Sequence, residues 1–184
     1  VADWDGNILG LFRMPDATIF SIDVAVAKAR NVAYYADAAA LQPADMIDTN
    51  NDGTPDVAPG VAFTNRTFRF LSTAFFPSGI DGTGGGPFSI LNDPNVNRQT
   101  AENLDNSAPA DAADHQSVLG FDAFNPGSNF REPVTGLQNG VVFFPGSTPL
   151  YKDGTLVGGF GVSGDGVGQD DVVTFSGAGE LLPR

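Results

Sequence analysis

The sequence lacks cysteine altogether and contains a single histidine, His115, among its 184 residues. The absence of cysteine excludes disulfides, thiolate metal sites, cysteine nucleophiles and covalent c-type haem attachment within this chain. A single histidine also excludes a three-histidine zinc site and a histidine-pair metalloprotease motif. No apolar run approaches the roughly 18 residues that are needed to span a bilayer.

Basic residues are also scarce. The chain has 9 Lys and Arg against 22 Asp and Glu, which gives a net charge of −13. A surface this acidic repels phosphate backbones, so nucleic acid is excluded as a partner and anionic membrane surfaces are disfavoured. Divalent cations suit such a chain better.

The length and composition predict a single domain that is rich in loops. Hydrophobic residues make up 41% of the chain, which is enough for a core, while 23 Gly and 13 Pro favour loops over a helix bundle. The chain starts at Val1 rather than Met, and we expect either a mature product or a fragment of a longer precursor.

The first part of the chain predicts a hairpin. Val1–Trp4 and Ile8–Met14 have the composition of strands, and Asp5-Gly6 between them is a tight-turn signal. Pro15 and Asp16 end the second strand.

A helix is expected next, from Ser21 as the N-cap to about Ala36. Its apolar stripe repeats at helical spacing, and Lys28, Arg30 and Asn31 lie off it. The stripe consists of Ile22, Val26, Ala29 and Ala33. Because several residues of this segment are alanine, we expect the helix to pack close to a sheet.

The C-terminal part predicts more strands and a second helix. Pro149–Lys152 and Thr155–Gly161 form a hairpin around Asp153-Gly154, after a strand at Gly140–Phe144. Gly168–Phe175 is expected to be a short helix. Sequential hairpins with helices predict an α+β fold, in which helices pack on an antiparallel sheet.

Residues 37–137 differ from both ends, because they are rich in Asn, Asp, Gly and Pro with scattered Phe. Phe68 and Phe70 stand at period two, which predicts a strand within Val61–Phe76. Disordered segments rarely hold so many phenylalanines, so we expect an ordered but irregular insertion in one domain spanning residues 1–184.

Two separated blocks of sequence resemble the GlcG/HbpS-like haem-binding domain family. The first block is Asp5–Met14 followed by Asp23–Ala29, with Arg13-Met14 and Lys28-Ala29 as its signatures. The second block contains Pro145-Gly146, Pro149-Leu150, Asp153-Gly154, Leu156–Gly159, Gly161–Gly164 and Gln169-Asp170. The resemblance implies a profilin-like α/β layer, oligomers and non-enzymatic binding of a small ligand.

The chain departs from the family in three ways. The family's domain opens with a long helix, whereas this chain starts inside the first strand, so the resemblance implies that the helix is disordered, removed or supplied by another chain or segment. The insertion is much longer than the family's connection. His115 lies in that insertion, away from the frame.

The sharpest local motif is a calcium-loop pattern of the form D-x-N-x-D-G-x-x-D. Oxygen ligands at the first, third and fifth positions converge on a hard cation, and a glycine at the sixth makes the turn. The alternative is an Asx-rich solvated turn. The candidate ligands are Asp48, Asn50, Asp52, Thr54 and Asp56.

A second motif, Gly159–Gly164, satisfies G-x-G-x-x-G. It lies near the chain end with no strand after it, so a strand of small residues under a packed helix is favoured over dinucleotide binding. In the resembled family this turn borders the ligand cleft, which makes Ser163 a candidate ligand contact. Three nearby acids are either a carboxylate cluster or first-turn residues of the helix: Asp165, Asp170 and Asp171.

Two cations are further candidates for ligand binding. Arg13 and Lys28 could bind a propionate or another carboxylate, or could be surface charges. His115 is either a haem or metal ligand or an exposed polar residue. Because the sequence offers no recognisable nucleophile–base pair, we predict that the protein is not an enzyme.

The leading hypothesis is an extracytoplasmic, periplasmic or secreted, binding or accessory module that is stabilised by calcium. Its partners would be other protein subunits, in a hetero-complex or a homo-oligomer. The alternative is a haem- or tetrapyrrole-binding protein for sequestration or sensing. That alternative needs an iron ligand on the frame, for which Met14 and Tyr151 are the remaining candidates.

Overall fold

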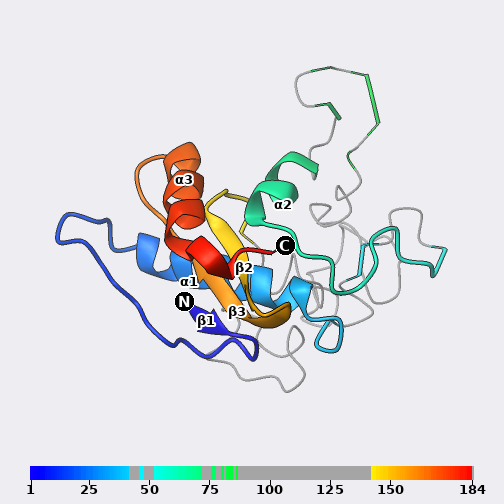
Figure 1. Ribbon diagram of the computed structural model, residues 1–184. Helices are drawn as coiled ribbons and strands as arrows, with labels where there is room; N and C mark the ends of the chain where they lie inside the picture. The colour runs from blue at the N-terminus through cyan, green and yellow to red at the C-terminus, as the bar shows by residue number, and fades with distance from the viewer. Residues whose placement is uncertain are drawn as a thin grey trace, which may run out of the picture.

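The computed structural model describes residues 1–41, 46–47, 52–71, 76–77, 80, 82–84, 86 and 142–183. The α+β class predicted from the sequence is confirmed (Figure 1). The elements are β1 (Ala2–Asp3), α1 (Ser21–Ala36), α2 (Asn65–Leu71), β2 (Ser147–Lys152), β3 (Thr155–Gly161), α3 (Val167–Ala178) and the 3-10 turn η4 (Gly179–Leu181). No helix in these residues is both long and apolar enough to cross a membrane.

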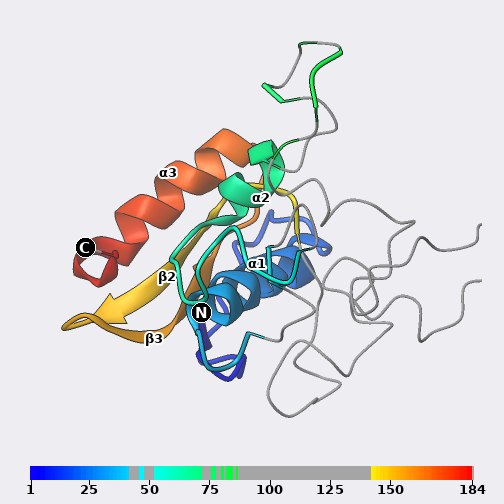
Figure 2. The same cartoon turned by 90° about the vertical axis from the view of Figure 1, so that its right-hand side faces the viewer.

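The three strands form an antiparallel sheet in the order β1-β3-β2. The predicted hairpin of β2 and β3 is confirmed, with Asp153 and Gly154 both at positive φ in its turn. Helices α1 and α3 cover opposite faces of this sheet, as Figure 2 shows. The register of the β2–β3 pair shifts between Leu150 and Tyr151, near the turn.

Helix α1 packs directly on the backbone of β3, as the alanine-rich sequence predicted. A methyl group added at Gly159 would overlap the carbonyl oxygen of Ala29, and one added at Gly161 would overlap that of Ala25. Glycine therefore allows the helix to contact the strand with no side chain between them. This contact explains the first two glycines of the G-x-G-x-x-G pattern, and the interpretation as a strand of small residues under a packed helix is confirmed for them.

The sequence predicted that α1 buries one apolar stripe and leaves its other residues off it, and this prediction is wrong for the second half of the helix. All residues from Ala27 to Ala36 are buried, including Lys28, Arg30 and Asn31, which are 1%, 3% and 6% exposed. The sheet, the first loop and α2 with the chain around it surround the helix, so no face of this half meets solvent. Its polar residues therefore need partners within the protein.

The described part of the insertion contains its own aromatic core beside the C-terminal end of α1. Phe68 is fully buried, and its ring centroid lies 4.9 Å from that of Tyr35 and 5.1 Å from that of Phe63. The strand predicted at Phe68 and Phe70 is wrong, because both belong to helix α2. Two phenylalanines two residues apart are also compatible with a helix, in which one is buried and the other faces outward. Phe68 is the buried one here, and Phe70 is 44% exposed.

Two other predicted strands do not form in the residues that the structure describes, and one predicted cap is wrong. Residues 8–14 form no strand beyond an isolated bridge between Ile8 and Ala2, and residues 142–144 form none either. The N-cap position of α1 is Phe20, not Ser21, and no side chain accepts a capping hydrogen bond there. The Ser21 hydroxyl instead lies 2.6 Å from that of Thr18. Residues 140–141 and His115 lie outside the described residues.

Replacing Gly159 with alanine should destabilise the protein by about 1–3 kcal/mol, the usual cost of overpacking a close contact. The new methyl group would collide with the backbone of Ala29, which cannot move without displacing α1. Urea denaturation measures the loss. Gly168→Ala is the matched control, because nothing lies within 4 Å of a methyl group there. An equal loss in both variants would show that the contact between α1 and β3 is not tight.

Candidate functional site

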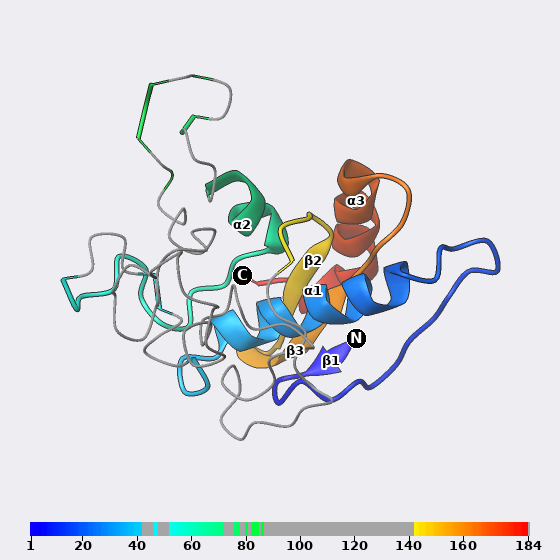
Figure 3. The same cartoon turned by 180° about the vertical axis from the view of Figure 1, so that it is seen from behind.

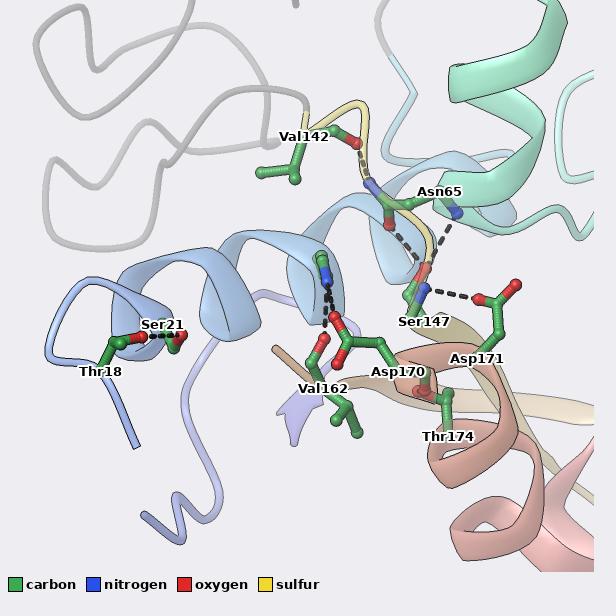
Figure 4. A network of polar contacts seen from close by, with 11 residues as sticks. Thr18, Ser21, Asn65, Val142, Ser147, Val162, Asp170, Asp171 and Thr174 are labelled. Atoms are coloured by element: carbon green, nitrogen blue, oxygen red, sulfur yellow. Dashed lines mark hydrogen bonds and ion pairs between the residues drawn. The ribbon is translucent and has the colours of Figure 1, made fainter. Parts of the chain in front are cut away.

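Among the described residues, the most buried charged side chain is that of Lys28, which the sequence analysis gave as a candidate ligand-binding cation. Its Nζ lies 3.0 Å from the Oδ2 of Asp170 and donates a hydrogen bond of 2.7 Å to the carbonyl oxygen of Val162 (Figure 4). The Lys28 and Asp170 side chains are 1% and 6% exposed. This pair links α1 to the first turn of α3. Lys28 is therefore part of an internal ion pair, and its interpretation as a surface charge is wrong.

Gly146, in the chain that enters β2, also contacts the place where Lys28 of α1 meets the first turn of α3, which we call the junction. Its N–H donates a 2.6 Å hydrogen bond to Asp171, and its carbonyl accepts one of 2.8 Å from the N–H of Val162. A methyl group at Gly146 would lie 3.0 Å from the Nζ of Lys28, and its φ of 112° is itself unfavourable for other residues. Asp171 also pairs with the half-exposed Arg66 of α2.

A second buried network holds α2 against the frame. Asn65 is fully buried, and its backbone N–H donates to the hydroxyl of Ser147 over 2.9 Å. Its side-chain amide donates to Asn31 of α1. The same amide donates to the carbonyl of Val142, and its Oδ1 accepts a hydrogen bond from Ser147 (Figure 4). One asparagine thus joins α1, α2 and the start of β2.

Burial lowers the pKa of Lys28, although the hydrogen bond that Lys28 donates to Asp170 and the negative charges of Asp170 and Asp171 oppose this effect. Burial also lowers the pKa of Arg30 to about 10, while its Nε donates to the carbonyl of Gly6 over 2.9 Å. Both shifts mean that the unfolded chain binds these protons more tightly. At neutral pH both groups are charged in the folded protein, so the cost of burying each charge lowers the stability of the fold in full. This cost disappears only as the pH rises from the lowered pKa of the folded protein to the pKa of the unfolded chain.

The other predicted ligand contacts do not join Lys28 in a site. Arg13 is exposed and donates a hydrogen bond to the carbonyl of Ala17 in its own loop. Ser163 is half-buried just beyond Val162. Of the three acids weighed as a cluster, Asp165 is exposed, while Asp170 and Asp171 belong to α3 and bind protein groups. These contacts favour a structural role for the junction.

A different place in the fold offers room for a ligand. A groove of about 790 Å³ follows β2 where it enters its turn, and the segment before α2 runs beside β2 there (Figure 2). Small-molecule sites usually measure roughly 300–1,000 Å³. The lining residues are Gly60, Ala62, Tyr151, Lys152, Asp153, Gly154, Glu180, Leu181, Leu182 and Pro183.

The groove combines apolar walls with a few polar groups. Tyr151 supplies a phenol, whose pKa burial raises, so it is protonated at neutral pH. Lys152 supplies a cation, and Asp153 and Glu180 supply carboxylates. A phenol oxygen is one of the ligands that hold haem iron in proteins, and a lysine suits a propionate. The groove therefore offers one candidate partner for the iron of a tetrapyrrole and one for a propionate, beside two carboxylates.

The two candidate iron ligands lie far apart in the fold. Met14 is 60% exposed in the loop before α1, and it does not line the groove. Figures 1 and 3 show that this loop extends beyond the N-terminal end of α1, whereas the β2–β3 turn lies towards its C-terminal end. Of the two, Tyr151 alone lines the groove.

Part of the predicted calcium loop is visible. Asp52 Oδ1 accepts a 2.8 Å hydrogen bond from the N–H of Thr54, and Gly53 between them has a φ of 83°. Asp52, Thr54 and Asp56 are exposed, whereas Asp48 and Asn50 lie outside the described residues. Within the described residues, no group of three or more histidine or acidic side chains is placed to hold a metal ion.

One known family covers almost the whole chain. The model of the family described as haem degrading protein HbpS-like matches residues 1–178. The chain belongs to the HbpS-like family. The resemblance read from the two blocks of sequence is therefore confirmed, and the family is associated with haem. No curated protein and no solved structure gives a significant match.

Sequence reasoning about this HbpS-like chain missed most residues of the groove and of the buried network. Asn65 is completely buried, and no pattern in the sequence analysis above singled it out. Gly60, Ala62 and Glu180 carry no local pattern that predicts binding. They come together only through tertiary packing around β2.

The Lys28→Met variant should lose about 3–5 kcal/mol of stability, because it leaves Asp170 buried without its cation. The Lys28→Met/Asp170→Leu double variant should recover most of that loss, since neither charge then remains buried. Chemical denaturation at pH 7 measures both. Arg66→Met is the control, and it should cost less than about 1 kcal/mol because the Arg66 side chain is half-exposed. A double variant as unstable as Lys28→Met would contradict this account.

Proposed function

We propose that this HbpS-like protein binds haem or a related tetrapyrrole in the groove beside β2, and that it does not degrade it. The observation that carries the proposal is the position of Tyr151, a candidate iron ligand on the frame, in a groove of about 790 Å³. The family's association with haem supports the choice of ligand.

Each part of the groove has a distinct role in this proposal. The phenol oxygen of Tyr151 would hold the iron, and Lys152 would pair with a propionate. Leu181, Leu182 and Pro183 would contact the apolar face of the macrocycle. The bound group would supply a redox-active iron.

Tyr151 makes the proposed binding dependent on pH. Burial raises the pKa of its phenol, so the group carries its proton at pH 7. Coordination of ferric iron through the phenolate oxygen releases that proton, and the affinity should therefore rise as the pH is raised. The same site would bind less tightly in mildly acidic solution.

The test is reconstitution with ferric haem, followed by its Soret band. Tyr151→Phe should shift the band and weaken binding at least tenfold, while Met14→Leu, outside the groove, should bind as the wild type does. Lys152→Gln should weaken binding without moving the band, because it removes a propionate partner and not the iron ligand. Loss of binding in Met14→Leu but not in Tyr151→Phe would place the iron elsewhere.

The same complex tests whether the protein is an enzyme. With peroxide, or with a reductant and oxygen, a binding protein should release or slowly bleach its haem at the rate of the free cofactor. Stoichiometric conversion to an open-chain tetrapyrrole would contradict the non-catalytic proposal. The family's description makes this the sharpest alternative.

A second proposal concerns the insertion. We propose that the loop from Asp48 to Asp56 binds calcium, and that the protein acts outside the cytoplasm, in a complex with other protein subunits or with copies of itself. The turn at Gly53 and the hydrogen bond between Asp52 and Thr54 support the loop, because they match the bend of a calcium loop. Millimolar calcium outside the cytoplasm would suit such a site.

Calcium should raise the melting temperature of the protein, because binding to the folded state alone stabilises it by mass action. At about a hundred times the dissociation constant, the gain is roughly 2.7 kcal/mol. Asp52→Ala should abolish the shift, while Asp165→Ala, an exposed acid of another loop, should leave it unchanged. A calcium shift that survives in Asp52→Ala would rule out this loop.

A further inference from the structure

The two sides of the groove come from parts of the chain that are far apart in sequence. Tyr151 and Lys152 at the end of β2 form one side, and residues 60–62, which we call the insertion wall, run beside β2 (Figure 2). Among the described residues, residues 58–64 make no backbone hydrogen bond to β2 and add no strand to the sheet. Strand pairing therefore does not set the width of the groove.

Side-chain hydrogen bonds join the chain that follows the insertion wall to β2. The backbone N–H of Asn65 donates to the Ser147 hydroxyl over 2.9 Å, and that hydroxyl lies 2.6 Å from the Oδ1 of Asn65 (Figure 4). The two bonds close a ring between residues that are 0% and 3% exposed. Because both groups are buried, removing one partner leaves the other without a hydrogen bond. The ring thus ties the start of α2 to the start of β2.

Apolar contacts hold the insertion wall against α1. Gly60 has a φ of 83°, and a methyl group there would lie 3.0 Å from the Cβ of Ala38, just beyond α1. The ring centroid of Phe63 lies 5.3 Å from that of Tyr35 in α1. These contacts fix the wall relative to α1, whereas the ring of hydrogen bonds at Asn65 fixes it relative to β2.

A flat, rigid ligand between two walls binds more tightly when both walls are already in place. Where one wall is mobile, binding must order it, and the conformational freedom lost lowers the affinity. Neither Asn65 nor Ser147 lines the groove. They can therefore act on a bound ligand only through the position of the insertion wall.

We infer that Asn65 and Ser147 are positioning residues of the groove, which set the distance between the insertion wall and β2. This distance is a property of the chain and needs no ligand. Its consequence for affinity rests on the proposed binding of haem. A buried pair that makes no contact with the ligand thus has a role in binding.

The distance between two spin labels measures the width of the groove without a ligand. The chain contains no cysteine, so Val61→Cys and Thr155→Cys provide two unique labelling sites. Val61 is exposed within the insertion wall, and Thr155 is exposed opposite Lys152 in the β2–β3 pair. Double electron–electron resonance should give a narrow distance distribution in this labelled protein. Ser147→Ala should broaden the distribution about twofold, because it breaks the ring with Asn65.

Thr174→Val is the matched control. Thr174 is 2% exposed and its hydroxyl donates to the carbonyl of Asp170 within α3, so this variant also loses a buried hydroxyl, but away from the insertion wall. It should leave the distribution as narrow as in the labelled parent. Asn65→Ala is a second test variant, and either test variant decides alone if circular dichroism shows the other unfolded. Equal broadening in Thr174→Val, or no broadening in the test variants, would overturn the inference.

Titration with ferric haem separates this role from the proposed function. Ser147→Ala should weaken binding at least fivefold without moving the Soret band, because Tyr151 still holds the iron, while Thr174→Val should bind as the wild type does. A merely structural role would lower the melting temperature of both variants and leave both affinities unchanged, which would contradict the effect on binding. If the wild type binds no haem while Ser147→Ala still broadens the distance distribution, the proposed function fails and the positioning role stands.

Discussion

The direct contact between α1 and β3 is the constraint on which the rest of the structure depends. Because Gly159 and Gly161 present no side chains, the helix lies against the strand's own backbone. The second half of α1 is then enclosed on every side. Its polar residues must be paired internally, and each pairing fixes another element: Lys28 fixes the start of α3, Arg30 fixes the first turn, and Asn31 contacts the chain entering β2.

The ion pair and the asparagine network have different consequences for stability and specificity. A buried pair such as Lys28–Asp170 contributes little net free energy compared with apolar residues of the same shape, because desolvating both charges is costly. Removing only one of the two charges destabilises the fold, because the other charge then stays buried without a partner. Asn65 makes neutral hydrogen bonds to Asn31 of α1 and to two residues of the chain that enters β2, and these bonds admit one position of α2. The two networks therefore determine where the elements lie more than how stable they are.

The sequence predicted those parts of the fold that depend on local patterns. The hairpin of β2 and β3, the span of α1 and the close packing of small residues all follow from turn signals, period and alanine content. The strand predicted at residues 8–14 does not form. Its side chains are apolar on both faces, and no packed layer covers one face to fix its register. The helix that contains Phe68 was not predicted, because two aromatic residues at period two are too short a pattern to tell a helix from a strand. The groove could not be predicted, because β2, the segment before α2 and the chain end contribute to it together.

The position of α2 links the buried network to the groove. Asn65, the first residue of α2, is tied to Ser147 at the start of β2, and Gly60 and Ala62 line the groove a few residues earlier. The same strand then continues to Tyr151 and Lys152, which also line the groove. One wall of the groove therefore comes from the insertion and is held by a hydrogen-bond network that contains no groove residue. The insertion is therefore part of the groove, because Gly60 and Ala62 line it together with residues of β2 and of the chain end.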